Sequence, residues 1–121
     1  DSPNGYKFET FVFDALRFVK HAPVAVEIGR EGEYTPTKQP EGDNSVRAAR
    51  DSMTRYWAKW LDAAGCAVPR QEDGAPKHAI EISPAFALTQ DEFAAKMRPN
   101  GFSMDTGIVV HADGALENVR Q

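Results

Sequence analysis

The chain has 121 residues, of which 41% are hydrophobic and 26% charged, and this composition suits a soluble chain that buries one modest core. Its formal net charge of -4 argues against a nucleic-acid-binding surface, which needs a concentrated stripe of basic residues. No apolar stretch approaches the roughly 20 residues needed to span a bilayer. We therefore expect neither nucleic acid nor a membrane among its partners.

The helical spacing of apolar residues from 8 to 19 predicts the first element, a helix with one buried stripe. The stripe comprises Phe8, Phe11, Val12, Ala15, Leu16 and Val19. Pro23 is expected to stop this helix, because proline lacks the backbone N–H that a helix interior needs. Residues 24–28 follow with β-branched side chains in partial alternation, and this pattern predicts a strand.

Glycine and proline between residues 31 and 43 predict an extended, turning loop. The longest helix is expected next, capped by Asp43 or Asn44 and ended by Gly65. Trp57 and Trp60 fall on its apolar face, where large aromatic side chains most often cover a neighbouring sheet. We therefore predict a core role for both tryptophans and no stacking platform for nucleic acid.

Residues 69–77 combine Gly74 and Pro76 with charged side chains and are interpreted as a mobile linker. A strand at 80–82 is predicted next, and Thr89 with Glu92 has the spacing of a capping box that opens a short helix ending at Met97. The stretches 107–111 and 115–119 flank an Asp-Gly turn. They predict a β-hairpin, because Asp-Gly tolerates the positive backbone angles of a tight turn.

A single cysteine, Cys66, excludes an intrachain disulfide and a paired-cysteine zinc site. It has no basic or histidine activator nearby in sequence, so no nucleophilic role is expected. His21, His78 and His111 lack partners at metal-ligand spacing, and structural or surface roles are expected for them. Because the N-terminus also lacks the basic and apolar regions of a signal peptide, we expect a cytoplasmic chain.

Two motifs flank the predicted strand at 24–28: Lys7-Phe8-Glu9-Thr10-Phe11-Val12-Phe13-Asp14 and Arg30-Glu31-Gly32-Glu33-Tyr34-Thr35-Pro36-Thr37-Lys38. The pair resembles the UDP-sugar pyrophosphorylases, most closely those that make UDP-N-acetylglucosamine. Ile80-Glu81-Ile82-Ser83-Pro84 and the terminal hairpin resemble the small C-terminal domain of that family, and residues 43–50 resemble the start of its long helix. Two departures are present: Gly32 replaces the usual acidic residue, and Gln39 stands where asparagine is common.

The resemblance implies an α/β fragment in two parts. Residues 1–68 would be the C-terminal end of a nucleotidyltransferase catalytic domain, 69–77 a linker, and 78–121 a small α+β C-terminal domain. The implied reaction converts UTP and N-acetylglucosamine 1-phosphate into UDP-N-acetylglucosamine and pyrophosphate. Mg²⁺ is expected with the triphosphate, bound outside these residues.

The glycine-rich LxGGxGTRLG loop, which holds the nucleotide in that family, has no counterpart in this sequence. Because its backbone amides supply most of the phosphate cradle, these residues alone are expected to be inactive and to need a missing N-terminal catalytic region. The alternative is a non-catalytic module that binds a ligand or a partner protein through the surface around Phe13.

The resemblance also implies site residues. Lys38 would reach the phosphates as a catalytic and substrate-binding residue, since an ammonium offers a compact charge with three donors. Phe11 and Phe13 would shape the pocket around the N-acetyl group, with Glu9 and Arg30 as further substrate-binding residues.

Each of these residues could also have a structural or surface role without contact to substrate. Lys38 could be a solvated loop lysine, and Arg30 a solvated loop charge or an anchor for the loop. Phe11 lies on the apolar stripe and could equally be a core residue, whereas Phe13 lies off it and is expected to be exposed. Glu9 could only stabilise a helix N-terminus.

Overall fold

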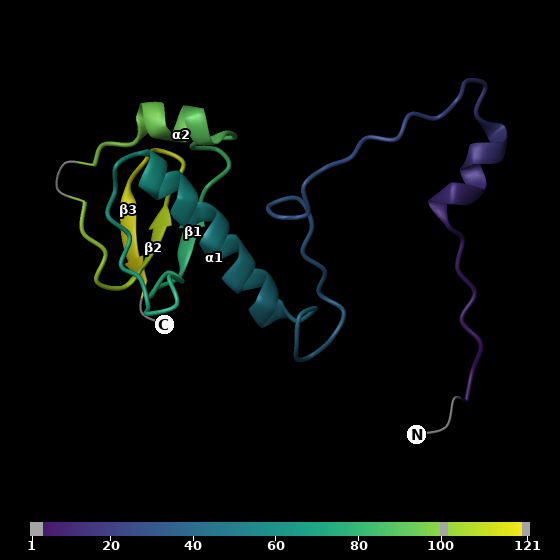
Figure 1. The fold of residues 1–121 in the computed structure, drawn as a ribbon, viewed down its shortest axis with the longest axis horizontal. Coiled ribbons are helices and arrows are strands. Elements are labelled where there is room, and N and C mark those ends of the chain that lie inside the picture. The colour runs from purple at the N-terminus through teal and green to yellow at the C-terminus, as the bar shows by residue number, and fades with distance from the viewer. Residues whose placement is uncertain (1–3, 100–101, 120–121) are drawn as a thin grey trace.

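The computed structural model describes residues 4–99 and 102–119, and within these ranges three helices and three strands form. The helices are the 3-10 helix η1 (Val12–Phe18), α1 (Val46–Ala63) and α2 (Gln90–Lys96); the strands are β1 (Ile80–Ile82), β2 (Gly107–Val110) and β3 (Leu116–Val119). The sheet order is β1-β2-β3, with β1 parallel and β3 antiparallel to β2. The result is a small mixed α/β fold, with α1 against β1 and α2 against α1 (Figure 1). No helix in these ranges is long and apolar enough to cross a membrane.

The core lies between α1, α2 and one face of the sheet. In β1 the two isoleucines are buried while Glu81 between them is exposed, the alternation that a sheet with one covered face requires. Trp60 lies in the core as predicted, and Trp57 packs against it while partly exposed. The principal core side chains are Ala58, Trp60, Leu61, Ile80, Ile82, Phe93, Ile108 and Val110. One core thus joins α1 to the residues after 77, while the assignment of 1–68 and 78–121 to separate domains of a larger protein stays a prediction.

Helix α1 begins one residue later than a cap at Asn44 predicts and two residues later than a cap at Asp43 predicts, so both predicted caps are wrong. Ser45 is the N-cap: its Oγ accepts a hydrogen bond from the Ala48 N–H at 3.1 Å. The Asn44 backbone carbonyl instead closes the preceding loop by accepting from two N–H groups of residues 38 and 39. Gly65 ends the helix as predicted, since its positive φ of 78° lets its own N–H and that of Cys66 reach back to the last turn.

The predicted buried helix at 8–19 is wrong. Only the 3-10 helix η1 forms, no residue in it is buried, and the whole stripe from Phe8 to Val19 is exposed. The physical reason is that a short helix is marginal without a surface to pack on, and the described chain offers none there. In Figure 1 η1 (purple) stands apart from α1 and the sheet. The predicted strand at 24–28 is wrong for a related reason, because no neighbouring strand pairs with it.

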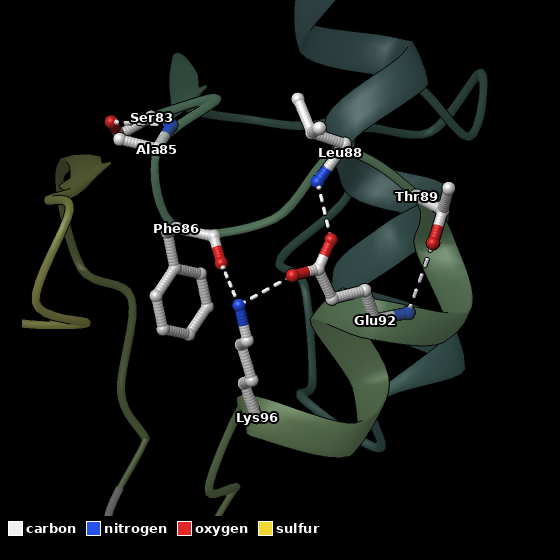
Figure 2. A network of polar contacts seen from close by, with 7 residues as sticks. All are labelled: Ser83, Ala85, Phe86, Leu88, Thr89, Glu92 and Lys96. Carbon is white, nitrogen blue, oxygen red and sulfur yellow. Dashed lines mark hydrogen bonds and ion pairs between the residues drawn. The ribbon is translucent and has the colours of Figure 1, made fainter.

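Helix α2 begins at the predicted capping box. Thr89 Oγ1 accepts from the Glu92 N–H at 3.2 Å, and the Glu92 carboxylate accepts from the Leu88 N–H at 2.9 Å (Figure 2). The Lys96 ammonium, one turn further on, lies 2.5 Å from Glu92 Oε1 and 2.7 Å from the Phe86 carbonyl oxygen. This network closes the 83–88 loop onto the helix.

The pKa of Glu92 lies below its ordinary value of 4.5, first because of the backbone hydrogen bond from Leu88 and second because of Lys96. A carboxyl whose pKa is lowered by folding stabilises the fold above its unfolded pKa, and this contribution disappears as pH falls through the lower folded pKa. We expect wild type to lose more stability than Glu92→Gln in urea unfolding between about pH 6 and pH 3. Parallel pH profiles for the two proteins would contradict this assignment.

The β2–β3 hairpin is confirmed, with Val109 opposite Glu117 and Val110 opposite Leu116. Of the two turn residues Asp113 and Gly114, only Gly114 has a positive φ, 83°. A Cβ on Gly114 would lie 2.8 Å from the Phe86 ring, so glycine is needed for this close packing as well as for the turn.

The segment 69–77, predicted as a linker, is held by contacts between its two sides. The Gln71 N–H donates a hydrogen bond to the Ala75 carbonyl oxygen, and Arg70 and Pro76 form a β-bridge.

Candidate functional site

The loop of residues 30–35 lies against one stripe of α1. Gly32 has a φ of 82°, and a Cβ at this position would lie 2.5 Å from Cε2 of Tyr56. On either side of this contact, Glu31 Oε1 pairs with Lys59 Nζ at 2.6 Å and Thr35 Oγ1 lies 3.4 Å from Ser52 Oγ. We call these three contacts the loop staple: Glu31–Lys59, Gly32–Tyr56 and Thr35–Ser52.

The residues of α1 that take part in the loop staple were not predicted from the sequence as part of a site. Ser52, Tyr56 and Lys59 recur at the four- and three-residue spacing that places side chains along one side of a helix. This side lies beside the predicted apolar face, and the mixture of hydroxyl, aromatic and ammonium groups was available as a signal. Its partner loop, however, could not be identified from spacing, because the contacts join residues 17 to 28 positions apart.

Arg30 begins the loop. Its guanidinium lies 4.9 Å from the centre of the Tyr34 ring, within the range of a cation–π contact. Its carbonyl oxygen accepts hydrogen bonds from the N–H groups of Glu33 and Tyr34, which make the turn. The structure thus gives Arg30 a part in the shape of the loop, whereas its predicted contact with substrate stays a prediction.

Lys38 is exposed at the far end of the same loop. Its backbone N–H donates to the Asn44 carbonyl oxygen at 2.7 Å, and the Gln39 N–H donates to the same oxygen at 3.0 Å. No carboxylate of the described residues lies within ion-pair distance of its ammonium. The main chain at Lys38 is therefore held while the side chain is open to an anion.

The remaining predicted site residues lie in the N-terminal segment. Phe13 is 71% exposed, as predicted, but Phe11 is 58% exposed too, so the expected contrast between an inward and an outward phenylalanine is wrong. Glu9 forms an ion pair with Lys7 and precedes η1 without capping it. Among the described residues, no hydrogen bond or ion pair joins this segment to the loop staple or Lys38. The structure thus groups Arg30 with Lys38 on one loop and leaves Glu9, Phe11 and Phe13 apart.

A groove of about 410 Å³ adjoins the loop staple. Tyr56, Trp57 and Trp60 line it from α1, and Pro84 and Leu88 line it from the loop before α2. The three aromatic rings pack on one another, with ring centres 4.7 to 5.6 Å apart. The loop staple is thus attached to a side of the helix that an aromatic cluster makes rigid.

The other candidate reactive groups do not assemble into a site. Burial raises the pKa of the Cys66 thiol, and the Asp62 carboxylate raises it further, so the reactive thiolate is disfavoured. His111 Nε2 lies 2.7 Å from Glu117 Oε2 across the hairpin. Within residues 4–99 and 102–119 no three histidine, cysteine or acidic side chains gather as a metal site.

Comparison with known proteins finds relatives described as pyrophosphorylase-like, in agreement with the resemblance of the two motifs around the loop. The chain is homologous to UDP-N-acetylhexosamine pyrophosphorylase-like protein 1. It is 32% identical to the human protein over 95% of this chain, and 34% and 35% identical to the mouse and Xenopus tropicalis proteins over 93% and 84%. It spans only about a quarter of the length of these relatives. Neither a family model nor a solved structure matches the chain.

Proposed function

We propose that the chain is part of a cytoplasmic uridylyltransferase that forms UDP-N-acetylglucosamine and pyrophosphate from UTP and N-acetylglucosamine 1-phosphate. The observation that carries this proposal is the state of Lys38. Its ammonium is exposed and has no ion pair with the residues that the structure describes, its main chain is fixed to Asn44, and it ends a motif that resembles one of the pyrophosphorylases. The homology to pyrophosphorylase-like proteins supports the same class of reaction.

In this reaction a phosphate oxygen of the sugar 1-phosphate attacks the α-phosphorus of UTP. The new P–O bond forms as the bond between the α-phosphorus and its bridging oxygen breaks, and that oxygen leaves with pyrophosphate. Because phosphoryl transfer needs mainly alignment and charge stabilisation, the role of Lys38 is to donate to phosphate oxygens that gain charge. Arg30 shapes the loop that carries Lys38.

The residues of the N-terminal segment complete the proposal. Phe11 and Phe13 contact the N-acetyl group and Glu9 the substrate once the segment packs against the catalytic region that holds the nucleotide. Their present exposure agrees with a need for further protein at this surface. Magnesium accompanies the triphosphate and neutralises part of its charge, with ligands from outside these residues.

The test of the proposed function is pyrophosphate release by the full-length protein that contains this sequence, supplied with UTP and N-acetylglucosamine 1-phosphate. We expect release that depends on both substrates, and N-acetylgalactosamine 1-phosphate is the comparison that measures sugar choice. Failure to transfer uridylyl groups to either sugar phosphate would overturn the proposal.

We expect the 121-residue chain alone to show no pyrophosphorylase activity and at best feeble affinity for UDP-N-acetylglucosamine. The reason is that the chain lacks the backbone amides of the glycine-rich loop, which supply most of the phosphate cradle. Calorimetric titration with UDP-N-acetylglucosamine measures this directly. Submicromolar binding would mean that the residues of this chain form a complete site.

A second function, a module that binds a partner protein, is favoured by a different observation. Large apolar side chains are exposed throughout the segment from Tyr6 to Ile28, far more than a soluble surface of this size usually carries without a partner. The upstream reading frame discriminates the two functions. A glycine-rich nucleotide loop encoded there favours the enzyme, whereas its absence favours the module.

A further inference from the structure

We propose that Tyr56 is a positioning residue, which holds the loop of residues 30–38 on α1 and thereby fixes the place of Lys38. The inference rests on the proposed function only in giving Lys38 a catalytic role; the mechanical coupling between Tyr56 and Lys38 stands on its own. No motif of the sequence points to Tyr56, and it is brought to the loop by the fold.

The first step is that the contact between Tyr56 and Gly32 is close and that the tyrosine ring is supported by its neighbours. A Cβ added to Gly32 would lie 2.5 Å from Cε2 and 2.9 Å from Cδ2 of the tyrosine ring, so the ring lies directly against the loop backbone. The ring cannot move away freely, because its centre lies 5.1 Å from that of Trp57 and 5.6 Å from that of Trp60. Trp60 is itself in the core. Tyr56 is therefore a fixed surface that the loop meets.

The second step is that one end of the segment from residue 31 to Lys38 attaches to α1 and the other end to the residue directly before the N-cap of α1. At one end the loop staple joins Glu31, Gly32 and Thr35 to the middle of α1. At the other, the Lys38 N–H is bonded to the Asn44 carbonyl, directly before the Ser45 cap. The stretch between these attachments contains Pro36, whose φ is fixed by its ring. Few backbone dihedral angles between these attachments are therefore free to absorb a shift at Gly32 before it reaches Lys38.

The experiment compares two glycine substitutions with the same backbone cost. Gly32→Ala introduces both the positive-φ strain and the collision with Tyr56, whereas Gly74→Ala introduces the strain at a φ of 83° with no atom within 4 Å. We expect the ¹⁵N order parameter of the Lys38 amide to fall from about 0.85 to below about 0.6 in Gly32→Ala and to stay unchanged in Gly74→Ala. An unchanged Lys38 order parameter in Gly32→Ala would overturn the proposal.

A second variant keeps the test decisive if Gly32→Ala does not fold. Glu31→Gln removes only the exposed ion pair to Lys59 and leaves the core untouched. We expect it to lower the order parameter of the Lys38 amide, but by less than Gly32→Ala does. A rigid Lys38 in Glu31→Gln, with Gly32→Ala unfolded, would also overturn the proposal.

Turnover in the full-length protein separates this inference from the proposed function. We expect Gly32→Ala to lower kcat by about tenfold or more with little change in KM, because small misplacements of a catalytic group act mainly on the transition state. A mobile Lys38 together with an unchanged kcat would overturn the positioning role. If instead Lys38→Ala itself leaves turnover unchanged, the catalytic role of Lys38 fails while the proposed reaction stands, and the order parameters alone decide the mechanical coupling.

Discussion

Replacing Lys38 by alanine in the full-length protein is expected to lower kcat by about 100- to 1000-fold, the usual effect of removing one donor that stabilises charge in the transition state. Thermal stability should hardly change, because the Lys38 side chain is exposed and its backbone hydrogen bond to Asn44 survives the substitution. Pyrophosphate release and thermal unfolding, measured on the same preparation, give the two values.

Lys77→Ala is the matched control, since Lys77 is also an exposed loop lysine without an ion pair among the described residues. We expect it to retain wild-type turnover. A Lys38→Ala enzyme within about twofold of wild type would remove Lys38 from the catalytic residues, and an equal loss in Lys77→Ala would point to a general effect of surface charge.

Phe93→Ala is expected to lower the free energy of unfolding by about 3–5 kcal/mol, the usual cost of a cavity left by a large core side chain. Phe93 is 0% exposed and its ring packs against those of Trp60 and Phe86, with centres 5.9 and 5.7 Å away. Small domains are stable by only about 5–15 kcal/mol, so the loss is a large fraction of the total. Urea unfolding of the chain measures it.

The control for Phe93 is Phe13→Ala, which deletes the same side chain from a position that is 71% exposed. We expect a change within about 0.5 kcal/mol, as for most surface substitutions, and better solubility because an exposed apolar group is removed. Similar losses for the two variants would mean that Phe13 is buried in solution and that the N-terminal segment packs on the core.

The elements after residue 45 follow closely from local signals. Thr89 and Glu92 cap α2 as their spacing predicts, and Gly65 and the Asp-Gly turn end their elements where a positive φ is needed. The alternation of Ile80, Glu81 and Ile82 likewise gives the correct buried face. Such signals are readable because each depends on residues a few positions apart.

The elements before residue 45 could not be predicted in the same way. The apolar stripe from Phe8 to Val19 indicates a helix with a buried face, yet burial depends on a second surface that periodicity cannot supply. The strand at 24–28 likewise needs a neighbour. For the candidate site, the motif singles out Lys38, whose role stays a prediction, whereas the contact of Gly32 with Tyr56 depends on tertiary packing and was found only in the structure.

The environment of Cys66 makes the chain convenient for site-directed spectroscopy. The thiol is the only one in the sequence, lies in the core at 3% exposure and has a raised pKa. Maleimide reagents should therefore react with it only slowly near neutral pH. A cysteine introduced at exposed Thr37 would then be labelled alone, without first replacing the native one. A probe there sits beside Lys38 and reports the mobility of this end of the loop in wild type and in Gly32→Ala.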